Sequence, residues 1–424
     1  MRRWTYRIVS ALLLLLAAFC VFVYVAQFYP RRVAHPLSRL AQETLVIRHA
    51  RIYTSPAEPP IEDGSILVRD GLIAAVGKEI EIPASATEVP CNHCVVMAGF
   101  WNAHVHFTEP KWAGAEWKSA ATLDPQLADM FLSRGFTTVI DVGSNPADTL
   151  SIRRRVEAME LKGPFIYTSG PPLYPPNGVP YYLGDLPWWI RALMHQPKTP
   201  DAARDAVRSN FNIGADLTKL FTGSWVQRGH VLPMPLPIAK AAVETSHLNG
   251  KLVWAHPSDL AGTRVAIDSG VDVLAHAPDD TKGITPALFE TMVQKNMAMV
   301  PTLKMFAWTV TTDKSYMVPI EAEVKQFHQM GGTLLFGTDV GYMTDYSTDG
   351  EFEELAKCGL TSMDVLAMLT TNPAQRMGVS RQKGTVTAGR LADLTILDAD
   401  PAENLSNFAR VHAVVRSGRV VWQK

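Results

Sequence analysis

Short hydrophobic runs recur along the middle of the chain, and each run ends in polar residues. Eight such runs cover residues 95–106, 137–143, 165–170, 217–221, 252–256, 273–277, 298–303 and 333–339. The stretches between them have helical composition and spacing, as at residues 202–212, 235–248 and 260–269. Eight alternating strand-and-helix units in roughly 250–300 residues favour a closed parallel barrel over an open sheet.

The two ends of the same region have a different pattern, rich in β-forming residues. These segments cover residues 44–52, 65–69, 72–76, 394–397 and 411–422. Asp63-Gly64 and Asp70-Gly71 separate the first three segments and are strong hairpin signals, and Ser417-Gly418 reads as a turn. We therefore predict one small β domain that is built from both ends of the chain.

The first 30 residues form a separate segment. Three arginines within the first seven residues precede an uncharged stretch from Ile8 to Tyr29, which has about the length that crosses a bilayer as a helix. An uncleaved anchor is favoured over a cleaved signal, because Tyr24 stands where a cleavage site needs a small residue. The basic excess before the segment then places the enzyme outside the cytoplasm, in the periplasm or extracellular space. Secretion after signal cleavage is the alternative.

These patterns define a domain organisation. We expect an N-terminal membrane anchor or signal at 1–30, a linker at 31–43, a composite β domain at 44–96 plus 385–424, and a barrel at 97–384.

Charge and cysteine content remove several function classes. The chain has 424 residues, and 40 basic against 41 acidic residues give a net charge of −1, so no nucleic-acid partner is expected. Four cysteines are too few for a disulfide scaffold. Cys91 and Cys94 form a C-x-x-C, which we interpret as two thiols or a local disulfide rather than a redox pair or half a zinc site, because no second such motif exists.

The ends of the predicted barrel strands carry residue types that bind metals. Side chains at the carboxyl ends of barrel strands converge on one mouth. The first run ends in His104-Val105-His106, and residues two apart on an extended chain face the same side, so both imidazoles can bind one ion. Later runs carry Lys219, His256, His276 and Asp339. Each has an ordinary alternative as a core residue or helix cap, but the set as a whole predicts a metal site.

Seven short motifs lie within this region. They are Met97-Ala-Gly-Phe-Trp-Asn-Ala-His-Val-His, Thr137-Thr-Val-Ile-Asp-Val-Gly, Lys219-Leu-Phe, Val300-Pro-Thr-Leu, Phe336-Gly-Thr-Asp, Thr371-Asn-Pro-Ala and Gly389-Arg-Leu-Ala-Asp-Leu. From about Thr44 onward the chain thereby resembles the amidohydrolase superfamily, in the branch similar to imidazolonepropionase-like and Xaa-Pro dipeptidase-like enzymes. The resemblance implies an α/β fold, a distorted (β/α)8 TIM barrel with a small β-sandwich domain formed from both chain ends, here preceded by one N-terminal hydrophobic helix.

The resemblance also implies a role for each candidate ligand. The implied ligands are His104, His106 and Asp339 for one divalent ion, His256 and His276 for a second, and a carboxylated Lys219 that bridges both. Zinc suits such a set of nitrogen and oxygen ligands. Two ions that share a water lower its pKa and supply a bridging hydroxide. Asp339 would take the proton from this hydroxide and pass it to the leaving amine.

The implied reaction is hydrolysis of an amide-type C–N bond in a small molecule such as a dipeptide, an N-acyl amino acid or a cyclic amide. A lactonase, esterase or phosphotriesterase-type activity at the same site is the alternative, since a metal pair serves esters as well. A one-metal site like that of adenosine deaminase is disfavoured by Lys219 and Pro257-Ser258. A non-catalytic scaffold is disfavoured because no ligand is missing. A homo-oligomer is left open.

Several positions depart from the branch pattern and bear on the substrate. Asn102 stands where an aspartate is common, and Ala275 where a glutamate is common. The loop over residues 171–183 is rich in proline and tyrosine, and loops at this face of a barrel shape pockets. Candidate substrate contacts are Asn102, Tyr174, Asn177, Tyr181, Tyr182 and Tyr342. The alternative for the loop is a rigid lid that makes no specific contact.

Overall fold

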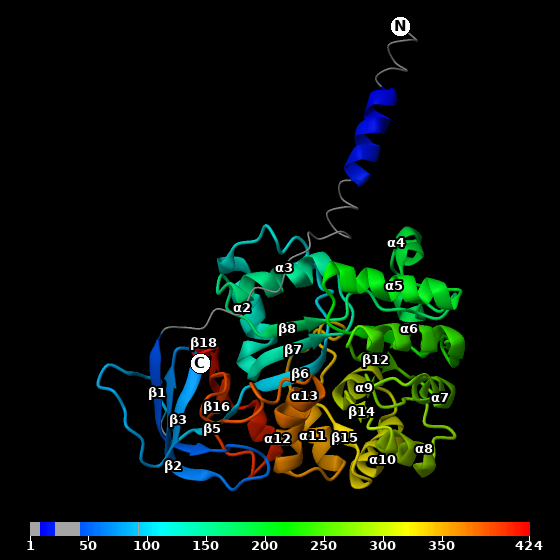
Figure 1. Ribbon diagram of the computed structural model, residues 1–424. Coiled ribbons are helices and arrows are strands. Elements are labelled where there is room, and N and C mark those ends of the chain that lie inside the picture. The colour runs from blue at the N-terminus through cyan, green and yellow to red at the C-terminus, as the bar shows by residue number, and fades with distance from the viewer. Residues whose placement is uncertain (1–8, 22–42, 92) are drawn as a thin grey trace.

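Eight parallel strands form the centre of the protein in the computed structural model, which describes residues 9–21, 43–91 and 93–424 (Figure 1). One sheet holds β6 (Phe100–Val105), β7 (Phe136–Asp141) and β8 (Phe165–Thr168), and another holds β9 (Thr218–Phe221), β12 (Val253–His256), β13 (Val273–Leu274), β14 (Ala298–Met299) and β15 (Thr333–Leu334). Parallel bridges from Val105 to Val340 and from Leu173 to Leu220 join the two sheets. The result is a TIM-barrel-like α/β fold; seven of the eight strands fall within the predicted runs, and β7 begins one residue before its run.

Helices cover the outside of these strands (Figure 1). They are α2 (Ala120–Met130), α3 (Pro146–Glu157), α4 (Trp188–Leu193), α5 (Pro200–Ile213), α6 (Leu236–Leu248), α7 (Leu260–Ser269), α8 (Pro286–Gln294), α9 (Leu303–Thr309), α10 (Met317–Gln329), α11 (Asp349–Lys357), α12 (Ser362–Leu369) and α13 (Thr371–Arg376). The predicted helices at 202–212, 235–248 and 260–269 are confirmed as α5, α6 and α7. Local signals set their ends: the Thr199 side chain caps the start of α5, and Gly214 ends it in the left-handed region at a φ of 108°.

A separate eight-stranded sheet lies beside these strands and combines both ends of the region from residue 43 to residue 424 (Figure 1). Its strands are β1 (Thr44–Ile52), β2 (Ile61–Arg69), β3 (Leu72–Gly77), β4 (Thr87–Glu88), β5 (Val95–Ala98), β16 (Leu394–Leu397), β17 (Val411–Arg416) and β18 (Arg419–Gln423). A sandwich was predicted, but all eight strands belong to one sheet, because β5 pairs with both β1 and β16. Ile47, Ile66 and Ile396 share one hydrophobic core, so both halves of the sheet contribute to it.

The predicted run over residues 95–106 consists of two strands. β5 belongs to the eight-stranded sheet and β6 to the central parallel strands, and Gly99 lies between β5 and β6. A Cβ atom at Gly99 would lie 2.2 Å from the hydroxyl of Thr137, so this junction requires glycine. The hydrophobic pattern hides the break because the residues on both sides of it are buried.

The expected membrane anchor is wrong. Residues 9–21 of this segment are described by the structure, and they are helical. No helix among the described residues is long and apolar enough to cross a membrane. The rest of the predicted anchor and the linker up to residue 42 lie outside the described residues. The membrane partner and the location outside the cytoplasm, which were both inferred from this anchor, are withdrawn with it.

The C-x-x-C segment forms a local disulfide. Cys91 and Cys94 are bonded to each other, with their Cα atoms 5.4 Å apart. The sequence predicted either two thiols or a local disulfide at this motif rather than a redox pair or half a zinc site. The structure contains the local disulfide. The two sulfurs are therefore not free thiolates for a metal.

Candidate metal centre

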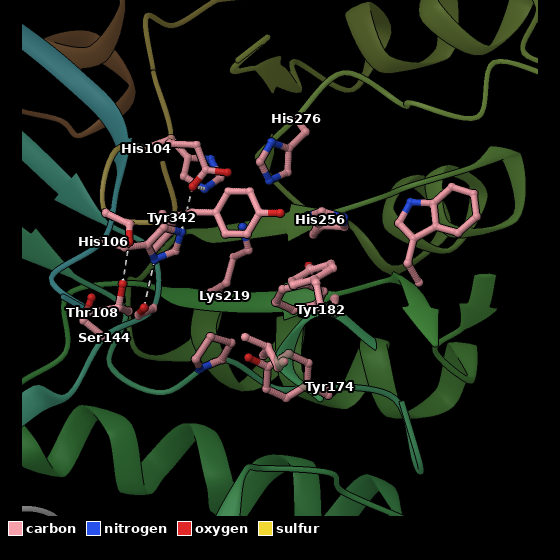
Figure 2. A pocket seen from close by; sticks show the side chains of 18 of the residues that line it. His104, His106, Thr108, Ser144, Tyr174, Tyr182, Lys219, His256, His276 and Tyr342 are labelled. Carbon is pink, nitrogen blue, oxygen red and sulfur yellow. Dashed lines mark hydrogen bonds and ion pairs between the residues drawn. The ribbon is translucent and has the colours of Figure 1, made fainter. Parts of the chain in front are cut away.

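The six predicted ligand residues line one cavity of about 1140 Å³. His104 lies in β6, His106 directly after it, Lys219 in β9, His256 at the end of β12, and His276 and Asp339 shortly after β13 and β15. The carboxyl ends of parallel barrel strands meet at one mouth, so residues from distant parts of the chain come together there. Figure 2 shows the four histidines and Lys219 around this cavity.

His104 and His106 present the same ring nitrogen to Asp339. Their Nε2 atoms lie 3.3 Å and 3.0 Å from Asp339 Oδ1. Their Nδ1 atoms lie 2.6 Å and 2.8 Å from the carbonyl oxygens of Ala275 and Gly143. A carbonyl can only accept a hydrogen bond, so each Nδ1 carries a proton, and in the neutral imidazole each Nε2 keeps its lone pair. Burial lowers the pKa of His104 to about 4, which also favours its neutral form.

With both imidazoles neutral, three electron-pair donors converge without a hydrogen between them. His104 Nε2 and Asp339 Oδ1 are buried and have no hydrogen-bond partner among the described residues. Buried polar atoms without partners are destabilising, and facing lone pairs repel one another. A cation removes both problems, and the ligand atoms of His104, His106 and Asp339 lie within 4.8 Å of one another. These residues thus fit a divalent metal ion of the kind that binds nitrogen and oxygen ligands.

His256 and His276 lie next to this group. The ring centroids of His276 and His104 are 4.4 Å apart, and those of His276 and His256 are 4.5 Å apart. His276 Nδ1 lies 2.7 Å from Thr302 Oγ1, which donates in turn to the carbonyl of Pro301. Because that hydroxyl proton is already used, His276 donates from Nδ1 and keeps a lone pair on Nε2. Burial, the largest cause, lowers the pKa of both histidines well below the usual value.

The Thr302 hydroxyl accepts a hydrogen bond from His276 and thereby positions the ring. Groups that hydrogen-bond the second nitrogen of a metal-binding histidine fix its ring orientation. We therefore expect Thr302→Val to weaken metal binding by about 10- to about 100-fold. Metal retention during dialysis against a graded chelator measures the effect. Thr291→Val is the matched control, because its hydroxyl bonds only to the carbonyl of Ala287 on the exposed face of α8. Equal metal retention in the two variants would show that Thr302 does not act on the site.

Lys219 is enclosed by the barrel. Its side chain is 1% exposed, and Nζ lies 5.5 Å from the ring centroid of Phe221. Burial lowers the pKa of Lys219 to about 7, while the negative charge of Asp339 opposes the shift. An amine with such a pKa is uncharged in a large fraction of molecules at neutral pH, and its nitrogen can then act as a nucleophile.

Asp141 supports the site and was not singled out from the sequence as a site residue, although its motif was noted. The fully buried Asp141 carboxylate accepts hydrogen bonds from the Ser144 hydroxyl, from Thr168 Oγ1 at 2.6 Å and from the backbone N–H of Gly143 at 3.3 Å. Burial raises the pKa of Asp141. These bonds hold the loop whose Gly143 carbonyl accepts the proton of His106 Nδ1.

Four of the six candidate substrate contacts line the cavity. They are Tyr174, Tyr181, Tyr182 and Tyr342. The rings of Tyr182 and Tyr342 meet edge to face, with centroids 5.7 Å apart. Tyr174 packs against Phe221 with a centroid separation of 4.6 Å, and Phe221 stacks on His256 at 4.8 Å. The tyrosines therefore form a wall beside the histidines (Figure 2).

The other two candidates, Asn102 and Asn177, do not line the cavity. Asn102 is fully buried and donates to Thr338 Oγ1 at 2.7 Å, while its carbonyl oxygen accepts from the backbone N–H groups of His104 and Thr338. It thus joins β6 to the segment that follows β15. Asn177 has a φ of 58°, a left-handed conformation that asparagine tolerates better than most residues do.

Comparison with known proteins identifies the family. Residues 95–421 match the amidohydrolase family. Ochratoxinase from Aspergillus niger is 21% identical over 404 residues, which is 86% of this chain and 82% of that protein. A solved Xaa-Pro dipeptidase with bound methionine is similar in fold, with a TM-score of 0.77, 20% identity and coverage of 90% of this chain and 100% of that one. A putative prolidase from Bifidobacterium longum has a TM-score of 0.75 and 25% identity, and 90% and 95% of the two chains are covered.

The family match covers most of the chain, and the fold matches over nine-tenths of it. The resemblance to the Xaa-Pro dipeptidase-like branch is confirmed by these matches. The chain therefore belongs to the amidohydrolase family and is a hydrolytic enzyme.

Proposed function

We propose that this enzyme hydrolyses amide-type carbon–nitrogen bonds of a small molecule with the help of two divalent metal ions, most simply zinc. The observation that carries the proposal is the convergence of four imidazoles, one buried lysine and one buried carboxylate on a single cavity. Similarity to enzymes named Xaa-Pro dipeptidase and prolidase supports an amide-type substrate. We also propose that the surrounding strands form one distorted (β/α)8 barrel over residues 97–384. This barrel would lie beside a β domain of residues 44–96 and 385–424.

The ligand residues divide into two groups in this proposal. His104, His106 and Asp339 hold one ion, because their unpartnered atoms already converge. His256 and His276 would hold the second, and Lys219, as a carbamate, would contribute an oxygen ligand to each. The uncharged amine of Lys219 attacks carbon dioxide, a C–N bond forms, and loss of one proton leaves an anionic group with two oxygens. Such a group binds two cations, whereas an ammonium would repel them.

Asp339 carries the proton in the proposed reaction. When bound, the two ions lower the pKa of the attacking water and polarise the substrate carbonyl. Asp339 directs Oδ1 at the two histidines and has Oδ2 left to accept a proton from the water. The water oxygen forms a bond to the carbonyl carbon, the C–N bond breaks, and Asp339 returns the proton to the leaving nitrogen. The products are a carboxylic acid and an amine.

Tyr182 and Tyr342 are the proposed polar contacts to the substrate. Burial raises the pKa of both phenols, so both keep their hydrogen at neutral pH and can donate it. Both side chains line the cavity beside the ligands. A phenol at this place can donate to the carbonyl or to a carboxylate of the substrate.

Metal analysis and an activity screen test the proposal. We expect close to two divalent ions per purified chain and hydrolysis of at least one class among dipeptides, N-acyl amino acids and cyclic amides. Chelation should abolish this activity, and added zinc should restore it. Retained hydrolysis in metal-free wild type would falsify the proposal. Activity on lactones alone would favour the esterase alternative.

A further inference from the structure

Apolar side chains from α4 and the chain around it contribute to the cavity lining. We call this part of the lining the α4 arm, and it consists of Leu183, Leu186, Ile190, Leu193, Met194 and, from α5, Ile213. None of these six side chains carries a charge or a hydrogen-bonding group. Other residues of the lining, such as His195, Asp279, Asp280 and Tyr316, contribute polar groups.

The apolar surface of the α4 arm is not covered by the rest of the described protein. Leu193 is 43% exposed, and Leu183, Leu186, Ile190 and Met194 are only partly buried. Proteins seldom leave several large apolar side chains facing one hollow unless a ligand or partner covers them. Trp188, on the same short helix, is 75% exposed and does not line the cavity, so α4 has one side toward the hollow and one away from it.

The arm and the candidate ligands belong to the same cavity. The segment that carries α4 begins and ends beside Tyr174, because the backbone N–H of Tyr174 donates a hydrogen bond to the carbonyl of His195 at 2.8 Å. Tyr174 packs on Phe221, and Phe221 stacks on His256. Because both groups of residues line one cavity, a molecule whose reacting bond lies at the histidines can also contact the arm.

We propose that the substrate is an N-acyl amino acid with a long unbranched acyl chain, and that the chain occupies the α4 arm while the amide lies at the ligand cluster. This inference rests on the proposed function. A dipeptide fits the arm less well, because an ammonium group placed there would lose hydration without gaining a charged or polar partner from the six lining side chains. Burial of each methylene in the arm strengthens binding.

Binding of straight-chain carboxylates tests the arm without requiring hydrolysis. Chains from about four to about twelve carbons are titrated calorimetrically into metal-loaded, full-length protein. We expect affinity to rise by about fourfold per added methylene until the arm is full. A double variant, Ile190→Asn with Leu193→Asn, should bind the longest chain at least about tenfold more weakly and the shortest chain as wild type does. Trp188→Asn, on the outer side of the same helix, is the matched control and should match wild type at every length.

The outcomes separate this inference from the proposed function. Chain-length dependence without hydrolysis of any amide would support the arm and overturn the proposed function. Hydrolysis of N-acyl amino acids together with binding that is flat across chain length would overturn the arm and leave the proposed function in place. Leu186→Asn, which lies before α4, provides the same comparison if the double variant fails to fold. Unchanged long-chain binding in a folded arm variant would also overturn the arm.

Discussion

Asp339→Asn should lower kcat/KM by between about 10²- and about 10⁴-fold, the usual contribution of a positioned proton carrier. An amide oxygen can still bind a cation, but an amide does not accept a proton at neutral pH. The substitution suits this backbone position, because Asp339 has a φ of 60° and asparagine tolerates that region as aspartate does. Its loss of activity therefore reports on chemistry rather than on strain.

Metal content measured on the same sample makes this experiment decisive. Asp280→Asn is the matched control, because it removes a carboxylate from the wall of the same cavity without touching the ligand cluster. We expect it to change kcat/KM by less than about tenfold, since a charge at a distance acts only through space. An Asp339→Asn protein that holds both metals and keeps wild-type activity would remove Asp339 from the proton transfer.

The convergence of the candidate ligand residues could be predicted from sequence because it depends on local rules. His104 lies in a buried strand and His106 directly follows that strand, and a spacing of two residues on an extended chain places both rings on the same side. His256 and Asp339 follow short apolar runs, and in a parallel barrel the ends of such runs share one mouth. Neither inference required knowledge of which distant residues touch.

The residues that orient the ligands could not be predicted in the same way. His276 depends on Thr302, which is 26 positions away, and His106 depends on the carbonyl of Gly143, which is 37 positions away. These contacts arise only when neighbouring strands are aligned. No sequence pattern indicates which distant residue will be the hydrogen-bond partner of a given hydroxyl or carbonyl. Thr302 and Asp141 were present in recognised motifs, but the motifs did not say which ligand each one supports.

The hydrophobic pattern also did not predict the lengths of individual strands. β13 and β14 have two residues each, although the runs that predicted them are several residues longer. A buried extended segment looks the same in sequence whether or not its backbone pairs with a neighbour. The hairpin of β10 (Gly223–Gln227) and β11 (His230–Pro233) was missed for a related reason, since its partly exposed residues do not form a continuous apolar run.

Lys219→Met should reduce the metal content from about two ions per chain to about one or fewer and remove most of the hydrolysis. Methionine has a similar length and keeps the apolar packing of β9, so the barrel should stay folded. What it lacks is a nitrogen that can form a carbamate. Water is uncharged and does not supply a two-oxygen anionic group, so it does not replace the missing bridge.

A second variant separates the missing bridge from a missing side chain. Lys219→Ala leaves a space that a small carboxylate such as acetate can enter, and a carboxylate supplies the same two-oxygen anionic group as a carbamate. We therefore expect added acetate to restore part of the metal content and part of the activity in Lys219→Ala, and to restore neither in Lys219→Met, where the methionine side chain fills the space. Metal content by elemental analysis gives a readout that does not depend on knowing the substrate. Two bound metals and full activity in Lys219→Met would exclude Lys219 as the bridge and reduce the proposed site to histidines and Asp339.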